Sequence, residues 1–169
     1  AQAETIELTD RITYLTGSIN TKSIGKVITK LLEFDDQSHD PIWLMINSFG
    51  GSVDAGFVLI DLIKTLQSPV NCVVTSKAYS MGAIITVFCR KRYIYEHGTM
   101  MFHEASYGAL GEDPSIRSRI EFNVKYLDRI HAEIAAMIEM PLVEYRDNIR
   151  DAWWVLAEEA LEAKFVDAI

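Results

Sequence analysis

Apolar positions in the first ninety residues alternate between the spacing of strands and the spacing of helices. Short apolar or β-branched runs of strand length occupy 12–17, 42–47 and 70–75. Apolar residues that recur every three or four positions occupy 24–34, 53–66 and 80–88. The run at 42–47 is apolar on both faces, which is typical of a covered parallel strand. This strand and helix order, with short connections, predicts right-handed βαβ crossovers and an α/β fold.

The second half of the chain predicts one long helix among short elements. The short elements are strands at 93–95, 99–103 and 165–167 and a helix at 157–164. Asp113-Pro114 supplies a capping residue and a proline in the first turn, and amphipathic spacing continues to Met140. About 25 residues at 1.5 Å each give a helix of about 37 Å. Because a domain of this size does not need so long a helix, we expect part of it to project and contact another subunit.

Composition indicates an ordinary globular domain. The chain has 169 residues, 49% hydrophobic and 24% charged, which favours a single folded domain. A net charge of −8 and one short basic cluster, Arg90-Lys91-Arg92, argue against nucleic-acid binding. No apolar run reaches the roughly 18 to 20 residues of a bilayer span, and no signal peptide is evident. We therefore expect a cytoplasmic protein that binds no membrane, with Cys72 and Cys89 as buried free thiols.

One serine lies where a strand-like run meets a helical one, in Lys77-Ala78-Tyr79-Ser80-Met81-Gly82. Open α/β folds bind ligands at the carboxyl ends of strands, so Ser80 could be a nucleophile with the Met81 amide facing an oxyanion. The alternative is that Ser80 only caps the helix. The hydrolase pattern G-x-S-x-G nearly matches, but Ala78 replaces its first glycine, and that class orders its triad Ser, acid, His in a usually longer chain.

A nucleophilic serine needs a base, and His103 is the best candidate among four histidines. His39 lies in a polar loop, His97 in a turn, and His131 is expected on a polar face of the long helix. His103 ends an apolar strand, where it is either a core residue or a base, and its position after the Ser80 helix favours the base.

Gly50-Gly51 follows the strand at 42–47. The pair is either a turn that uses positive φ or a bare backbone amide that a substrate carbonyl can approach closely.

Motifs along essentially the whole chain resemble the ClpP family, the proteolytic subunits of the Clp ATP-dependent protease. The motifs are Leu15-Thr16-Gly17, Ile46-Asn47-Ser48-Phe49-Gly50-Gly51-Ser52-Val53, Ala78-Tyr79-Ser80-Met81-Gly82-Ala83, Phe102-His103, Arg150-Asp151, Ala157-Glu158-Glu159-Ala160 and Val166-Asp167. The resemblance implies a ClpP/crotonase-type fold, a repeated βαβ superhelix with a projecting long-helix handle. It implies one peptidase domain over 1–169, with a core at about 1–103 and 141–169 and a handle at about 104–140.

The implied activity is that of a serine endopeptidase that hydrolyses unfolded polypeptides or short peptides inside a ring assembly. By resemblance, Ser80 is the nucleophile, His103 the base and Asp151 the orienting acid, while the amides of Gly51 and Met81 form the oxyanion hole. The expected assembly is a homo-oligomer of two stacked heptameric rings. An AAA+ Clp unfoldase is the expected partner and the user of ATP, and no metal or cofactor is expected on this chain.

Some positions depart from the family pattern. Phe49 replaces the usual proline before the glycines, and Glu104-Ala105 replaces the Gln-Pro that usually follows the histidine. One extra residue separates Asp151 from the Ala157 motif, so a register fixed on that motif would place Ala152 at the acid position. Asp147 is the other candidate acid, and Asp151 is preferred because its spacing from His103 is nearly that of the family.

Two other functions remain open. One is a catalytically weak ring subunit that scaffolds active paralogues, which the intact Ser80 and His103 disfavour. The other is a crotonase-type acyl-CoA enzyme, which would not need Ser80 and for which the sequence carries no strong CoA-binding signature.

Overall fold

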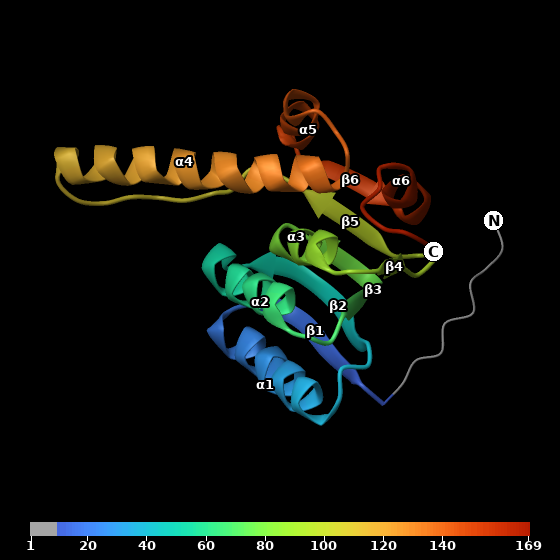
Figure 1. Ribbon diagram of the computed structural model, residues 1–169. Coiled ribbons are helices and arrows are strands. Elements are labelled where there is room, and N and C mark those ends of the chain that lie inside the picture. The colour runs from blue at the N-terminus through green and yellow to red at the C-terminus, as the bar shows by residue number, and fades with distance from the viewer. Residues whose placement is uncertain (1–9) are drawn as a thin grey trace. The chain divides into compact units, whose positions relative to one another are not determined.

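The computed structural model describes residues 10–169, which form six strands and six helices (Figure 1). The strands are β1 (Ile12–Ile19), β2 (Ile42–Gly51), β3 (Val70–Tyr79), β4 (Arg92–Ile94), β5 (Thr99–Phe102) and β6 (Trp153–Leu156). The helices are α1 (Thr21–Gln37), α2 (Val53–Thr65), α3 (Met81–Phe88), α4 (Asp113–Met137), α5 (Leu142–Ile149) and α6 (Ala157–Glu162). Two compact units result, one containing the chain up to Phe102 with Trp154–Ile169, the other containing His103–Trp153.

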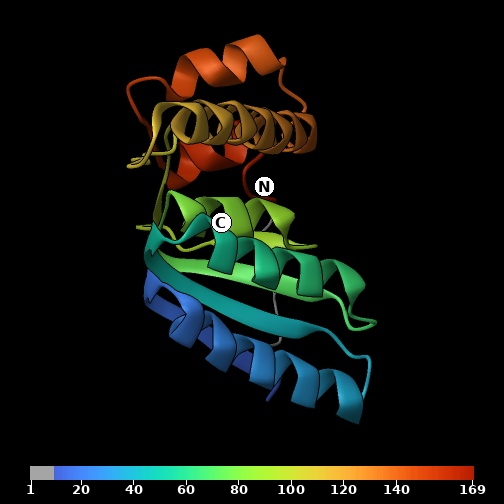
Figure 2. The same cartoon turned by 90° about the vertical axis from the view of Figure 1, so that its left-hand side faces the viewer.

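The sheet has the strand order β1-β2-β3-β5-β6, and β4 and β5 pair with successive stretches of β3. The pairs β1 with β2, β2 with β3, and β3 with β4 and β5 are all parallel. Parallel neighbours require crossover connections, which α1, α2 and α3 provide. Because the first three strands follow one another in one direction, crossovers of one hand place these helices side by side on one face of the sheet (Figures 1 and 2). The predicted α/β fold with repeated βαβ units is confirmed.

Strand β2 is buried on both faces, as its continuous apolar run predicts. Ile42, Leu44 and Ile46 are fully buried on one face. On the other face, Trp43 and Met45 belong to a second apolar cluster. The cluster consists of Trp43, Met45, Val73 and Tyr93, with Ile12 and Ala168 packed against it. Because β2 is covered on both sides, its last residues, Gly50 and Gly51, extend from a well-packed strand.

The predicted strand at 165–167 is wrong. Lys164 has a φ of 64°, and the N–H groups of Phe165 and Val166 both donate to the Ala160 carbonyl, at 2.9 and 3.4 Å. These groups end α6 in a left-handed turn and cannot also form a strand ladder. Only an isolated bridge, between Tyr93 and Ala168, remains.

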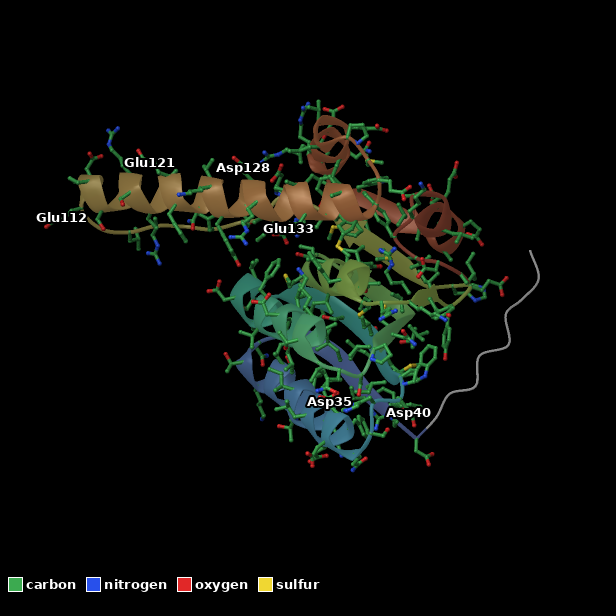
Figure 3. All side chains as sticks on the ribbon, in the orientation of Figure 1. Asp35, Asp40, Glu112, Glu121, Asp128 and Glu133 are labelled. Carbon is green, nitrogen blue, oxygen red and sulfur yellow. The ribbon has the colours of Figure 1, made fainter. Side chains whose placement is uncertain are left out.

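The long helix predicted from Pro114 onward is present as α4, which has 25 residues and carries proline in its first turn. Its surface mixes charge with large apolar side chains. Figure 3 labels the acidic residues on or beside it, Glu112, Glu121, Asp128 and Glu133. Its exposed apolar residues include Ile120, Phe122 and Val124. Within residues 10–169, neither α4 nor any other helix is long and apolar enough to cross a membrane.

Candidate active site

Ser80 lies at the junction between β3, which ends at Tyr79, and α3, which begins at Met81. Its φ of 55° and ψ of −119° lie outside the regions of strands and helices. Its N–H donates to the Met101 carbonyl of β5 at 2.8 Å, and its carbonyl accepts from the Ala83 N–H at 3.0 Å. The Ser80 side chain makes no capping hydrogen bond to α3, so the interpretation of this serine as a plain N-cap is wrong.

The backbone strain at Ser80 has no explanation in helix structure. Non-glycine residues in sparse regions of φ and ψ cost of order 1–3 kcal/mol and persist where the surroundings hold them. The other described non-glycine residues with positive φ are Glu139, Ala152 and Lys164, and each follows the end of a helix, where a left-handed residue is common. Ser80 precedes a helix instead. A strained serine on a sharp strand-to-helix turn is the geometry that presents a nucleophile to substrate.

Gly50 allows the end of β2 to lie directly against the Ser80 turn. Its φ is 101°, and a Cβ at this position would lie 2.8 Å from the Tyr79 carbonyl oxygen, 2.9 Å from the Ser80 Cβ and 3.3 Å from the Met81 nitrogen. No side chain fits there. Ser48 holds this end of β2, because its Oγ accepts from the Gly50 N–H at 3.1 Å and donates to the Gly17 carbonyl of β1 at 2.6 Å.

Gly51 lies equally close to β1. Its φ is 154°, and a Cβ would collide with the carbonyl of Ile19, its partner in the sheet. The next residue, Ser52, donates its N–H to the same carbonyl at 2.8 Å and caps α2 with its side chain. Gly50 and Gly51 are therefore the end of β2, held by close backbone contacts with β3 and β1, and not a turn.

Met81 is the first residue of α3, so the N-terminus of this helix lies beside Gly50 at the end of β2. Its side chain is buried against Gly56 of α2, which fixes the first turn of α3. The first hydrogen bond within the helix comes from Ala83, so the N–H groups of Met81 and Gly82 precede it. Such N–H groups and the helix dipole favour negative charge at this end. The structure therefore brings together Ser80, the Met81 amide and the Gly50-Gly51 backbone.

His103 and Asp151 both belong to the second unit, and both side chains are exposed. His103 is the residue after β5, two positions beyond the carbonyl that binds the Ser80 N–H. Asp151 lies in the turn after α5, followed by Ala152 with a φ of 67°. Asp147, the alternative acid, is engaged by Arg150, with Nη2 and Oδ1 2.8 Å apart. Within the part of the chain that the structure describes, Asp151 has no ion pair or hydrogen bond.

We expect Gly50→Ala to lower the free energy of unfolding by about 1–3 kcal/mol. Alanine would have to adopt the unfavourable positive φ of this position, and its Cβ would lie too close to the Tyr79 carbonyl oxygen. Denaturant unfolding followed by tryptophan fluorescence measures the change. Gly25→Ala in α1 is the matched control, since nothing lies within 4 Å of its Cβ position. That control should raise stability by about 0.5–1 kcal/mol. Equal stability of Gly50→Ala and the unaltered protein would contradict the close approach.

The polar face expected for His131 is wrong. His131 is 3% exposed on α4 and lies beside Ile130 and Ile134 in the buried stripe of that helix. The spacing of Ile130, Ile134 and Ile138 could have indicated this burial, because a residue three positions before Ile134 shares its face. Its partner Glu104 was not predicted as a functional residue. His97 is exposed as expected, and Cys72 and Cys89 are free and buried as predicted.

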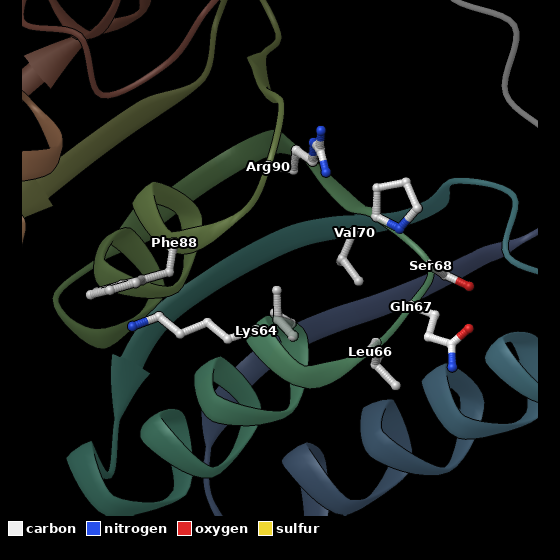
Figure 4. A pocket seen from close by; sticks show the side chains of 9 residues that line it. Lys64, Leu66, Gln67, Ser68, Val70, Phe88 and Arg90 are labelled. Atoms are coloured by element: carbon white, nitrogen blue, oxygen red, sulfur yellow. The ribbon is translucent and has the colours of Figure 1, made fainter.

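The cavity of Figure 4 lies away from Ser80. It has a volume of about 230 Å³ and is lined by residues at the end of α2, the start of β3 and the end of α3, including Lys64, Val70 and Arg90. Ser80 follows the opposite end of β3, roughly 30 Å distant at 3.3 Å per residue. Residues 10–169 contain no group of three His, Cys, Asp or Glu side chains that could hold a metal ion.

Comparison with known proteins supports the resemblance seen in the motifs. The model of the Clp protease family matches residues 4–169. ATP-dependent Clp protease proteolytic subunit 2 of Tropheryma whipplei is 33% identical over 169 residues, covering 96% of this chain and 92% of that protein. Proteolytic subunit 1 of Chlamydia muridarum is 31% identical, covering 96% and 87%, and that of Chlamydia pneumoniae is 33% identical, covering 94% and 86%. A match over nearly the whole chain identifies this protein as a member of the Clp protease family.

Proposed function

We propose that this protein is a serine endopeptidase with Ser80 as its nucleophile, acting on unfolded polypeptides or short peptides. The observation that carries the proposal is the strained Ser80 backbone, held between the Met101 carbonyl and the first turn of α3. Strain of this kind is maintained at positions where chemistry requires it. Membership of the Clp protease family supports the same activity.

The proposed reaction gives each nominated group a defined role. Ser80 Oγ attacks the peptide carbonyl carbon while His103 takes its proton, and His103 then returns a proton to the leaving amine. Asp151 holds the imidazole in the required tautomer and stabilises its charged form. The N–H groups of Gly51 and Met81 bind the oxyanion, each contributing about 3–4 kcal/mol to the barrier reduction. Water then hydrolyses the acyl-enzyme by the same steps.

Asp151 is the proposed acid rather than Asp147. The Asp147 carboxylate is already engaged by Arg150 at 2.8 Å, so using it would require breaking an ion pair. Asp151 carries no such partner among the described residues. The nearly family-like spacing between His103 and Asp151 supports the same choice.

We further propose that the active form is a homo-oligomer of two stacked heptameric rings that receives substrates from an AAA+ Clp unfoldase. The ATP would then be hydrolysed by that partner and not by this chain. The large exposed apolar residues of α4, Ile120, Phe122 and Val124, support a further protein contact along this helix.

A fluorophosphonate probe, which phosphonylates activated serines with loss of fluoride, tests the proposal when labelling is located by mass spectrometry. Native mass spectrometry first establishes that the sample is assembled. We expect labelling at Ser80, its loss in Ser80→Ala and its retention in Ser76→Ala, since Ser76 is an exposed serine of the same strand. An assembled oligomer that takes no label would contradict the peptidase and favour a scaffolding subunit.

A further inference from the structure

The segment that follows β5 depends on side chains for its position. Between His103 and Gly111 the chain forms neither helix nor strand, so no ladder of backbone hydrogen bonds fixes it. Glu104 is the second residue of this segment. One oxygen of its carboxylate, Oε2, lies 3.2 Å from Nε2 of His131 on α4. This contact attaches the segment to α4 one residue after the proposed base.

His131 is a firm anchor because it is buried. Its side chain is 4% exposed, whereas that of Glu104 is 44% exposed. The imidazole also packs against the Tyr145 ring of α5, with ring centroids 5.7 Å apart. Beside this contact, the Arg146 guanidinium of α5 donates to Asp128 of α4 at 2.6 Å, and Asp128 is labelled in Figure 3. Three segments of the second unit therefore meet around His131: the one after β5, α4 and α5.

Burial favours the neutral form of the His131 imidazole. Burial lowers the pKa of His131, and this effect outweighs the opposing attraction of the nearby Glu104 carboxylate. Nδ1 is buried and has no hydrogen-bond partner among the described residues, so a proton on that atom would lack an acceptor. The tautomer that fits carries its proton on Nε2 and donates it to Glu104.

We propose that His131 is a positioning residue for the base: by binding Glu104 it fixes the neighbouring His103 relative to α5, which leads into the turn that carries Asp151. This inference rests on the proposed peptidase function. The Cα atoms of His103 and Glu104 are consecutive and about 3.8 Å apart, so the Glu104 contact restricts the backbone positions open to His103. Misplacing a catalytic group by about 1 Å can lower the rate by about a hundredfold.

Protonation of His131 should destabilise this arrangement at acidic pH, because it buries a positive charge and adds an Nδ1 proton that has no acceptor among the described residues, and this cost outweighs the stronger attraction to Glu104. The charged and titratable groups that face His131 are Glu104, Asp128, Tyr145 and Arg146. Because the pKa of His131 is lower in the folded state, the folded protein binds fewer protons than the unfolded one below the usual value of about 6.5. Its stabilising contribution is therefore present above about pH 6.5 and is lost as the pH falls through the lowered pKa.

The test compares His131→Leu, which removes the donor, with His131→Gln, whose amide can still donate to Glu104 and does not titrate. We expect His131→Leu to lower kcat for a fluorogenic peptide about 10- to 100-fold with KM changed less than threefold. His131→Gln should recover most of that loss, and its kcat should fall less at acidic pH than that of the unaltered protein, because the glutamine amide does not titrate. His97→Gln, at an exposed turn histidine, is the matched control.

If His131→Leu fails to fold, Glu104→Ala still tests the proposal, because the Glu104 side chain is 44% exposed and its removal leaves the core intact. It should lower kcat about as much as His131→Leu, and the double variant should lose no more than either single one. An unchanged kcat in Glu104→Ala, or no recovery in a folded His131→Gln, would overturn the positioning role. If the unaltered protein neither hydrolyses peptides nor is labelled at Ser80, the peptidase proposal itself is refuted.

Discussion

Ser80→Ala is expected to lower kcat for peptide hydrolysis by about six orders of magnitude, or about 8 kcal/mol in barrier. Without the hydroxyl no acyl-enzyme forms, and only substrate binding and the oxyanion donors remain. The substitution should leave KM for a short peptide nearly unchanged, because Ser80 Oγ acts mainly in the transition state. Steady-state kinetics with a fluorogenic peptide, supported by active-site titration of the unaltered protein, measures the loss.

The fold should survive Ser80→Ala, which makes the kinetic result interpretable. Alanine keeps the Cβ at a φ of 55°, and the backbone bonds to Met101 and Ala83 do not involve the hydroxyl. Ser76→Ala is again the matched control and should keep full activity. Because nucleophile and base act as a unit, Ser80→Ala combined with His103→Ala should lose no more than either single variant. A Ser80→Ala protein with a tenth of normal activity would exclude Ser80 as the nucleophile.

Periodicity predicted most of the fold because its first half is built from local patterns that agree with the tertiary structure. The run at 42–47 is apolar on both faces, and β2 is indeed covered by helices on one side and by the Trp43 cluster on the other. The helical spacing at 53–66 matches α2 within one residue. In a parallel sheet each strand needs a crossover, so the order of patterns also determined the topology.

Where prediction failed, nonlocal or competing interactions decided the outcome. Phe165 and Val166 are residue types that favour strands, but their N–H groups donate to the Ala160 carbonyl at the end of α6. His131 has charged neighbours in sequence, yet the face it shares with Ile134 is the one that is buried. The geometry of Ser80 could not be read from sequence either, because both a capping and a strained serine are compatible with a strand-to-helix boundary.

The proposed catalytic groups differ in how far the sequence defines them. Ser80 and the Gly50-Gly51 pair occupy a junction whose position follows from the strands on each side, and the structure places them in contact. The proposed acid, Asp151, lies in a short turn, where a shift of one residue in the register would change the assignment. Asp151 and Ala152 are adjacent there, and Ala152 adopts a φ of 67°. Sequence spacing alone therefore leaves this assignment to experiment.

Asp151→Ala is expected to lower kcat by about four orders of magnitude, a smaller loss than that of Ser80→Ala. Without the acid, His103 loses the group that holds its tautomer and stabilises its charge, while the nucleophile and oxyanion donors remain. Asp151→Asn should lose about as much, since an amide favours the wrong tautomer. Measuring kcat for both variants separates this role from a general effect of charge at the turn.

Asp147→Ala provides the matched comparison, four residues earlier on α5. It removes an exposed ion pair with Arg150, with side-chain exposures of 72% and 66%, and such pairs contribute at most about 1 kcal/mol to stability. Its kcat should stay within about threefold of the unaltered protein. The opposite pattern, a large loss of kcat in Asp147→Ala and little change in Asp151→Ala, would show that Asp147 is the acid. Full activity in both variants would mean that His103 acts without a carboxylate from this turn, as a register with Ala152 at the acid position requires.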